Sequence, residues 1–333
     1  MKKAILLFGL LLMVTVVKSQ KLHSTFEILQ LMVDSKLRYE IKILDKPVLC
    51  KDYSEKLNRH DCYRVSTDSS IETIAYTLNE KSEPLFNKAE SFFQSNPDSA
   101  LIYYELALKA DPKLILVMTY IGQIYEQKNN MVDAIEWYKK AISKNYIDYM
   151  AHWFLADAYD ATGDLDKALD EIVIAQILNR NNVRIKSSLN RILKKVNKST
   201  EDWYFNPQIE IKKNSDKSIN VATDEIWAGY GLTKALWEFE PGYKESMGVK
   251  NNEHSTLEDE ECLLALLTTL ENKKSNIEND AQLRILKEAV NKKSVDEYIF
   301  YELFLPENPF IAYQLSQETI LGIKDYILNI RNK

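Results

Sequence analysis

The sequence lacks the residue patterns of the common reaction centres. Its four histidines, His23, His60, His152 and His254, are spread along the chain and include no HExxH pair. No GxSxG segment and no P-loop occur. These absences argue against a zinc metalloprotease, a hydrolase with a nucleophile elbow and a P-loop nucleotidase. We therefore predict no catalytic residue, no cofactor and no metal site.

A membrane-spanning apolar run is also missing. The run from Ala4 to Val17 has fourteen residues, fewer than the ~20 that cross a bilayer as a helix. Lys2 and Lys3 precede this run and Ser19 follows it, which is the pattern of a secretory signal peptide. We expect cleavage after residue 19, no stable membrane span, and an exported protein, either periplasmic or secreted. A retained membrane anchor is the competing interpretation.

Positive charge is scarce once this leader is removed. The whole chain carries 43 Lys and Arg against 49 Asp and Glu, and the leader holds Lys2, Lys3 and Lys18 but no acid. The remaining chain therefore has 40 cations and 49 anions, a net charge of −9. Nucleic acid is bound mainly by clustered cations that neutralise phosphates. We predict no nucleic-acid partner.

Cysteines are few, and two of them lie close together in the sequence. Cys50 and Cys62 border a polar stretch, and export favours disulfides, so we predict a bridge worth roughly 3 kcal/mol by the loop-entropy estimate. The alternative is a metal site that adds His60 and Asp61, but their spacing matches no CxxC or HxxxH template. Cys262 lies in a leucine-rich segment, where we expect a buried, reduced thiol.

A 34-residue interval dominates the middle of the chain. The segments GQIYEQKNNMVDAIEWYKKAI and ADAYDATGDLDKALDEIVIAQ begin at Gly122 and Ala156. In each segment apolar residues recur at helical spacing on both sides of a polar turn, which indicates a helical hairpin. The matching positions are Tyr125 and Tyr159, Ala134 and Ala168, and Ala141 and Ala175.

An earlier copy has a turn about one residue shorter and contains Ala100, Tyr104, Ala107 and Pro112. These residues resemble the tetratricopeptide repeat, a helical hairpin of 34 residues. Three copies span roughly 82–182, although Met118 and His152 stand where the family pattern has Trp. The following segment, VRIKSSLNRILKKV, predicts a capping helix. The resemblance implies that the first helix of each hairpin lines a concave surface that binds a protein or peptide.

Shorter patterns flank the repeats. TFEILQLMVDSKL has helical spacing, and YEIKIL alternates as a strand does. Residues 207–222 alternate on both sides of a polar turn at 214–216, which predicts a β-hairpin. Helical runs follow from Thr223 to the end of the chain.

We therefore predict a mostly α fold, in which tetratricopeptide-like helical hairpin repeats are followed by a β-hairpin linker and a second helical domain. The expected ranges are 1–19 for the signal peptide, 20–81 for an N-terminal cap region, 82–199 for the repeats with their capping helix, 200–222 for the linker, and 223–333 for the helical C-terminal domain.

The resemblance also predicts which side chains bind the partner. It places nine residues on the concave side: Phe86, Glu90, Phe93, Thr119, Gln123, Glu126, Trp153, Asp157 and Asp160. All of these residues except Thr119 are candidate contacts with the partner. Family members that hold an acidic peptide terminus use Lys and Asn at such positions, and none of the nine is either type. Four carboxylates favour a cationic segment, and the aromatic residues favour an apolar one. We predict a cationic or apolar partner segment.

Two clusters in the C-terminal part invite functional interpretations. Trp227, Tyr230, Lys234 and Trp237 recur at helical spacing, which favours a buried face with a snorkelling lysine over a ligand-facing stripe. The acidic run 258–261 precedes Cys262 and favours a stabilised helix start over a cation site.

The function we expect is that of an exported, non-enzymatic scaffold for protein–protein interaction, which binds its partner through the concave groove of the repeats. The alternative is an envelope enzyme with a catalytic C-terminal domain that the repeats recruit to its target. The sequence contains no nucleophile or metal constellation that supports this second hypothesis.

Overall fold

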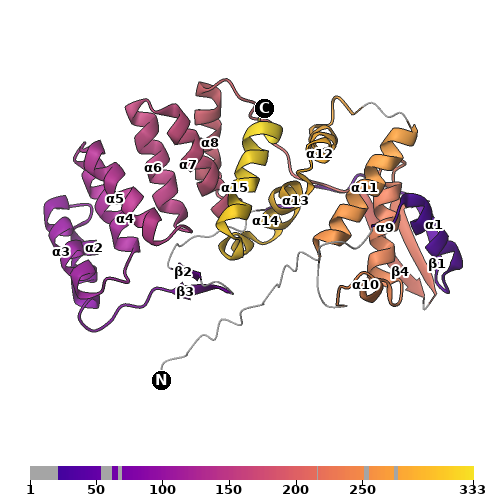
Figure 1. Ribbon diagram of the computed structural model, residues 1–333, viewed down its shortest axis with the longest axis horizontal. Helices are drawn as coiled ribbons and strands as arrows, with labels where there is room; N and C mark the ends of the chain where they lie inside the picture. Colours follow the sequence, from indigo (N-terminus) through magenta and orange to yellow (C-terminus); the bar gives the residue numbers. More distant parts are fainter. Residues whose placement is uncertain (1–21, 54–61, 67–69, 216, 251–254, 274–276) are drawn as a thin grey trace. The chain divides into compact units, whose positions relative to one another are not determined.

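The computed structural model describes residues 22–53, 62–66, 70–215, 217–250, 255–273 and 277–333 (Figure 1). The expected leader, 1–19, and the segment with His60 and Asp61 lie outside the described residues. In the described part of the chain, no helix combines the length and apolar character needed to cross a membrane. The prediction of a mostly α fold is confirmed, and the chain forms two compact units.

One unit, here the repeat unit, comprises Asp52–Trp203 and Glu288–Lys333. Figure 1 shows its helices stacked in series as antiparallel hairpins. They are α2 (Glu83–Phe92), α3 (Pro97–Ala110), α4 (Leu116–Gln127), α5 (Met131–Lys144), α6 (Tyr149–Thr162), α7 (Leu165–Leu178) and α8 (Val183–Lys195). The three predicted hairpins and the helix that follows them are confirmed.

The 34-residue interval reflects repeated capping as well as repeated packing. Asn96, Asn130 and Asp164 precede the second helix of each hairpin, and each side chain accepts a hydrogen bond from the backbone N–H three residues on. Such caps satisfy amide groups that have no partner within the helix. Ala134 and Ala168 are fully buried in these second helices, where small side chains let the paired helices approach closely.

The chain on both sides of the repeats completes the repeat unit. β2 (Cys62–Ser66) and β3 (Ile71–Ala75) form an antiparallel pair. The C-terminal part forms α13 (Val295–Tyr298), the π-helix η1 (Ile299–Phe304), α14 (Leu305–Glu307), the 3-10 helix η2 (Pro309–Gln314), α15 (Gln317–Tyr326) and the π-helix η3 (Ile327–Arg331). α15 packs against α7, and η2 packs against α7 and β3.

The other unit, here the sheet unit, comprises residues 22–51 and 204–287. Its elements are α1 (Thr25–Asp34), β1 (Arg38–Ile43), β4 (Ile209–Ser215), β5 (Ser218–Thr223), α9 (Ala228–Phe239), α10 (Tyr243–Ser246), α11 (Thr256–Lys273) and the first part of α12 (Ala281–Asn291). The strand order is β1-β5-β4, with β4 antiparallel and β1 parallel to β5. The predicted hairpin at 207–222 is therefore confirmed as β4–β5.

Helix α9 covers β4 and β5, and α1 and α11 pack against α9. Trp227, Tyr230 and Trp237 are buried, as predicted for the aromatic stripe. Gly231 permits the close approach of α9 to the sheet, because a Cβ there would lie 2.9 Å from Cγ1 of Val221.

The two units differ from the expected division of the chain. Residues 22–51, expected within an N-terminal cap, join the sheet unit because β1 pairs with β5. Residues 288–333, expected in the second helical domain, pack with the repeats. Both differences come from contacts between segments far apart in sequence, and such contacts leave no local pattern.

The structure shows no disulfide between Cys50 and Cys62, which lie in different units, so the bridge stays a prediction. Cys62 begins β2, and its carbonyl accepts a hydrogen bond of 3.1 Å from the Asn145 side chain. Cys50 lies exposed in the other unit, where its thiol donates to the Lys51 carbonyl over 3.7 Å. Cys262 is a fully buried thiol, as predicted.

Thiol labelling checks this arrangement. In non-reduced native protein, Cys50 is expected to react rapidly because it is exposed, and Cys62 more slowly because it is half-buried. Cys262 is expected to react only after unfolding, since burial raises the pKa of its thiol and also blocks access. Mass spectrometry of alkylated peptides measures all three rates. If Cys50 and Cys62 were labelled only after reduction, the disulfide between them would be shown to exist.

Candidate functional site

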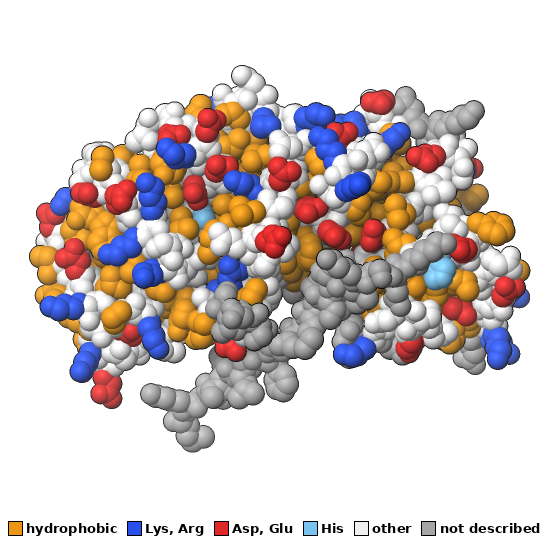
Figure 2. Space-filling view, viewed as in Figure 1, with side chains coloured by type: hydrophobic (Ala, Val, Ile, Leu, Met, Phe, Trp, Pro, Cys, Tyr) orange, Lys and Arg blue, Asp and Glu red, His pale blue; other side chains and the backbone are white. Residues whose placement is uncertain are grey.

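The first helices of the hairpins form one continuous face of the repeat unit. α4 packs against α6, and α6 packs against α8, so these helices are close neighbours along the array. We call the face formed by α2, α4, α6 and α8 the inner face. Figure 2 shows Lys and Arg interspersed with Asp and Glu on the side of the molecule that it displays.

Carboxylates of the inner face accept hydrogen bonds from buried tyrosines. The Tyr104 hydroxyl donates to Glu90, and the Tyr138 hydroxyl donates to Glu126 over 2.7 Å. The two tyrosines lie 34 residues apart, so the same bond recurs in successive repeats. Each bond links the first helix of a hairpin to the second. Glu90 and Glu126 were predicted as partner contacts, and part of their bonding capacity is used inside the repeat.

The third repeat replaces this bond with ion pairs to α8. Ile172 stands at the position equivalent to Tyr138 and has no hydroxyl to donate. Asp160 is paired instead with Arg191 and Lys195 of α8. Asp157 receives a hydrogen bond of 2.6 Å from Arg191 Nη2. The capping helix therefore neutralises much of the negative charge that the sequence indicated on this face.

Sequence reasoning did not assign these cations to the inner face, although a signal was present. Arg191 lies 34 residues after Asp157, which is one repeat interval. Extending the interval beyond the third hairpin would have placed Arg191 beside Asp157 on the same face.

The aromatic residues of the inner face are half-buried. The Phe86 ring lies 6.0 Å from Tyr104 and 6.3 Å from Tyr120, measured between centroids. Phe93 lies 6.2 Å from each of the same two rings. The rings thus form one cluster at the first repeat, which leaves part of Phe86 and Phe93 in contact with solvent.

Trp153 provides the aromatic surface of the third repeat. Its indole N–H donates to Ser188 Oγ over 3.0 Å, and its ring stacks on Phe154 at 5.4 Å. These contacts fix the orientation of the ring while it stays half-exposed. A rigid aromatic surface of this kind is typical of interface anchors.

The remaining two inner-face residues differ in accessibility. Thr119 is fully buried and donates to Asp148 over 2.8 Å, so it takes no part in a binding surface. Gln123 is half-buried, and its side-chain Nε2 is inaccessible to solvent with no hydrogen-bond partner among the described residues. An unsatisfied donor is uncommon in a folded protein.

Burial raises the pKa of Glu126, an effect that the hydrogen bond from Tyr138 partly offsets. Burial likewise raises the pKa of Asp157, and the positive charge of Arg191 partly offsets this rise. A carboxyl group with a raised pKa keeps its proton to a higher pH in the folded chain than in the unfolded one. The free energy of unfolding therefore falls as the pH rises from the unfolded to the folded pKa.

This linkage predicts the behaviour of Glu126→Gln. The amide keeps an acceptor for Tyr138 but does not ionise, so the variant is expected to gain stability relative to wild type as the pH rises above the usual glutamate pKa, through the range in which the folded wild-type carboxyl ionises. Urea unfolding at several pH values measures the difference. Glu136→Gln on α5 controls for the loss of an exposed carboxylate. A difference for Glu126→Gln that stays constant with pH would contradict the prediction.

A second polar cluster joins the C-terminal segment to the repeats. Glu302 is fully buried and accepts from Arg331 Nε at 2.7 Å, from Arg180 Nη2 at 3.3 Å and from the Tyr326 hydroxyl at 3.1 Å. Arg180 lies over the Tyr301 ring, 4.2 Å from its centroid. One carboxylate thus holds two buried guanidinium groups, one from the α7–α8 connection and one from η3.

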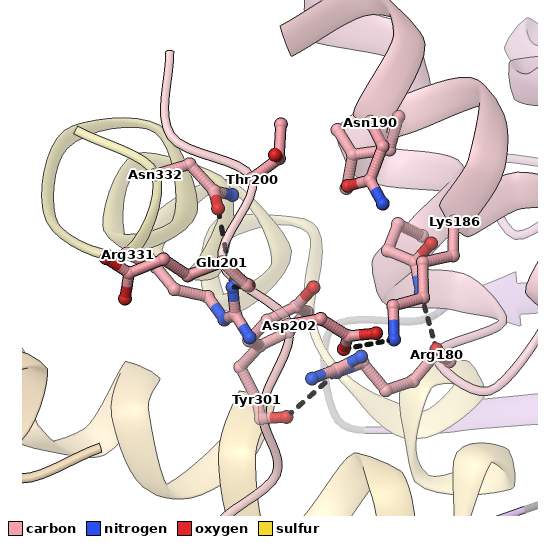
Figure 3. Close-up of a pocket in the computed structure, with 11 residues that line it drawn as sticks. Arg180, Lys186, Asn190, Thr200, Glu201, Asp202, Tyr301, Arg331 and Asn332 are labelled. Atoms are coloured by element: carbon pink, nitrogen blue, oxygen red, sulfur yellow. Dashed lines mark hydrogen bonds and ion pairs between the residues drawn. The ribbon is translucent and has the colours of Figure 1, made fainter. Parts of the chain in front are cut away.

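A small cavity borders this cluster, and Figure 3 shows its lining. Its side chains include Arg180, Lys186 and Asn332, and Lys186 is paired with Asp202. The cavity volume of about 20 Å³ holds roughly one water molecule. A substrate or cofactor does not fit there, and the cluster is best explained as a structural connection.

The sheet unit contains a third polar cluster. Lys234 Nζ lies 2.6 Å from Glu258 and 3.6 Å from Asp259, both buried in the first turn of α11. Glu261 is also buried and accepts from the Trp237 indole and the Tyr243 hydroxyl, each at 2.7 Å. The predicted helix start is confirmed, but the sequence did not show that its acids connect α11 to α9. Among the described residues, no group of three or more His, Cys, Asp or Glu is arranged to hold a metal ion.

Comparison with protein families matches residues 119–143 to the model described as Tetratricopeptide repeat. These residues cover most of α4 and α5. The hairpins on either side repeat the same caps and buried positions, so the helical array over about 82–182 has a tetratricopeptide-like fold.

Solved structures with similarity to the chain include tetratricopeptide domains. The first TPR of Spaghetti (RPAP3), bound to the HSP90 peptide SRMEEVD, is 21% identical over 36% of this chain and 99% of its own, with a TM-score of 0.35. The TPR2B domain of yeast Sti1 in a pHsp70 complex is 18% identical over 35% and 99%, with a TM-score of 0.33. MamA is 17% identical over 71% and 97%, with a TM-score of 0.30. No curated protein matches the sequence.

Proposed function

We propose that the chain is a protein-interaction scaffold, and that the inner face of its repeats binds an extended segment of a partner protein. The observation that carries this proposal is the set of half-buried aromatic rings, Phe86, Phe93 and Trp153, on the inner face. Extended segments bind through main-chain hydrogen bonds with side-chain pockets alongside, and rings of this kind would contact the apolar side chains of such a segment.

The contacts of the inner face favour an apolar segment over a strongly cationic one. Asp157 and Asp160 already have Arg191 and Lys195 as partners, so a cation of the partner would compete with internal ion pairs. The rings of Phe86, Phe93 and Trp153 form no ion pair that a partner would have to break, and part of each ring is exposed to solvent. We propose that apolar side chains of the segment supply most of the affinity and that Lys or Arg adds selectivity.

Peptide display on the full chain tests the proposal, because it selects binding sequences from a random library and needs no identified partner. Selected peptides are expected to be rich in apolar and aromatic residues. Trp153→Ala is expected to raise the dissociation constant of the best peptide about 30-fold, which corresponds to the ~2 kcal/mol of an interface hot spot. Trp137→Ala on α5 is the matched control, because Trp137 is also half-buried but lies on a second helix.

Fluorescence anisotropy measures the dissociation constants, and circular dichroism confirms that each variant is folded. The proposal fails if Trp153→Ala binds as tightly as wild type, or if Trp137→Ala weakens binding as much. A selected set dominated by acidic peptides would overturn the assignment of partner chemistry.

We further propose that the chain acts by binding and not by catalysis, and that it is exported. The support for binding is that the polar clusters around Lys234 and Glu302 consist of groups paired with one another inside their own unit. The support for export is the signal-peptide pattern of the first nineteen residues. Amino-terminal sequencing of the protein from fractionated cells tests export, and a start at Gln20 is the expected result.

A further inference from the structure

The sheet unit presents an open strand edge. β1 is the end strand of the order β1-β5-β4, and its outer side pairs with no strand among the described residues. Arg38 N donates to Lys217 O at 2.6 Å, and Leu44 N donates to Thr223 O at 3.1 Å. In a parallel ladder alternate residues face the neighbouring strand, so the even positions 38 to 44 bond to β5. Tyr39, Ile41 and Ile43 therefore direct their N–H and C=O groups to the open edge.

Large apolar side chains are exposed on β1 and on α1. Ile41 is 58% exposed and Ile43 is 87% exposed, although both belong to a strand. α1, which joins β1 through residues 35–37, exposes Phe26 at 76% and Val33 at 78% while its other side packs on α9. An exposed edge strand is a template for pairing with another chain, and the charged residues that usually protect such an edge alternate with apolar residues along β1, so they lie on only one face of it.

The charges of β1 select one pairing with itself. Antiparallel pairing at this edge must place odd positions opposite odd positions, because only those residues direct their hydrogen-bonding groups outward. With Ile41 opposite Ile41 of a second copy, Glu40 faces Lys42 of the second copy, and the reverse pair forms by symmetry. Shifting the register by two residues puts Glu40 against Glu40 or Lys42 against Lys42. Like charges directly opposite destabilise a sheet.

The same register also matches the apolar side of the strand. Tyr39 faces Ile43 of the second copy, and Ile41 faces its own counterpart, so one face of the pair is apolar and the other is charged. Glu40 has an exposed partner at present, Arg38 Nε at 2.7 Å. Exposed ion pairs contribute little, so exchange of this partner for Lys42 costs little.

We propose that two copies of this chain associate through antiparallel pairing of their β1 strands, with Ile41 on the two-fold axis. The two sheets then continue as one sheet of order β4-β5-β1-β1-β5-β4. The association is isologous, since each copy contributes the same surface. It brings two repeat units into one assembly and does not depend on what those units bind.

Charge reversal tests both the dimer and its register. Glu40→Lys places Lys against Lys42 of the second copy twice, and Lys42→Glu places Glu against Glu40 twice. Each single variant is expected to raise the dimer dissociation constant at least about 10-fold. An equimolar mixture of the two variants restores both opposite-charge pairs and is expected to form a heterodimer with an affinity near that of wild type. The double variant Glu40→Lys, Lys42→Glu is expected to form a homodimer again.

Sedimentation equilibrium of the full chain measures these constants, and far-UV circular dichroism checks that each variant folds. A wild-type chain that stays monomeric at ~100 μM, a concentration at which weak specific pairs associate, would overturn the proposal. Single variants that dimerise as tightly as wild type would overturn it as well. A mixture in which both variants remain monomeric would rule out this register.

Discussion

Glu302→Ala is expected to lower the free energy of unfolding of the repeat unit by about 3–5 kcal/mol, the usual cost of removing one partner from a buried ion pair. The substitution leaves Arg180 and Arg331 buried side by side without their shared carboxylate. Tyr326 also loses its hydrogen-bond acceptor.

Urea unfolding followed by circular dichroism measures this effect. Glu136→Ala on α5 is the matched control, because Glu136 is exposed and its ion pair with Lys139 is a surface pair. The control is expected to change stability by less than about 0.5 kcal/mol. A loss of less than about 1 kcal/mol for Glu302→Ala would contradict the structural role assigned to the cluster.

Gly122→Ala is expected to destabilise the second hairpin by about 2 kcal/mol, within the range for overpacking a core. A Cβ at this position would lie 2.4 Å from Cε1 of the buried Tyr138 ring. Alanine has higher helix propensity than glycine by about 1 kcal/mol, so the steric cost must exceed that gain. The third repeat supports this reasoning, because it pairs Ala156 with the smaller Ile172 at the equivalent positions.

Combining the substitution with Tyr138→Ile provides the control. Tyr138→Ile alone is expected to destabilise, because it removes the bond to Glu126 and some buried surface. In the Tyr138→Ile background, Gly122→Ala is expected to be neutral or stabilising, as in the third repeat. Thermal or chemical unfolding of the four proteins gives the coupling energy. Additive effects would show that the ring does not restrict position 122.

The repeats could be predicted because their determinants are local. The alanines, tyrosines and caps of each hairpin lie within one 34-residue copy, and the helical period identifies both helices of the pair. The β4–β5 hairpin was predictable for the same reason, since a short turn joins its two alternating strands. Local order of this kind is visible in a single sequence.

Contacts between distant segments were not predictable. β1 pairs with β5 although about 180 residues separate them in sequence. The alternating polar and apolar residues of β1 would suit the edge of any sheet, so they do not identify β5 as its neighbour. The segment 288–333 has helical runs but no feature that specifies the repeats as its neighbour. Glu302 illustrates the difficulty, because a single acid in an apolar run gives no indication of which arginines it will meet.

The position of the candidate residues on the inner face was predictable from the sequence, but the charge of that face was not. The resemblance to the repeat family identified the inner helices, and Phe86, Phe93 and Trp153 do lie there half-buried. The four acids were expected to attract a cation, yet two of them are paired with α8 and two with tyrosines. The identity of a side chain's internal partner depends on helix packing, which composition does not specify.

Photo-crosslinking from the inner face tests the central claim most directly. A benzophenone amino acid replaces Gln123 in one protein and Lys139, exposed on the second helix of the same hairpin, in another. Each is irradiated with the tightest peptide from the display selection, and the products are mapped by mass spectrometry. We expect the peptide to crosslink from position 123 and not from position 139. Crosslinking from position 139 alone, or equally from both, would contradict binding at the inner face.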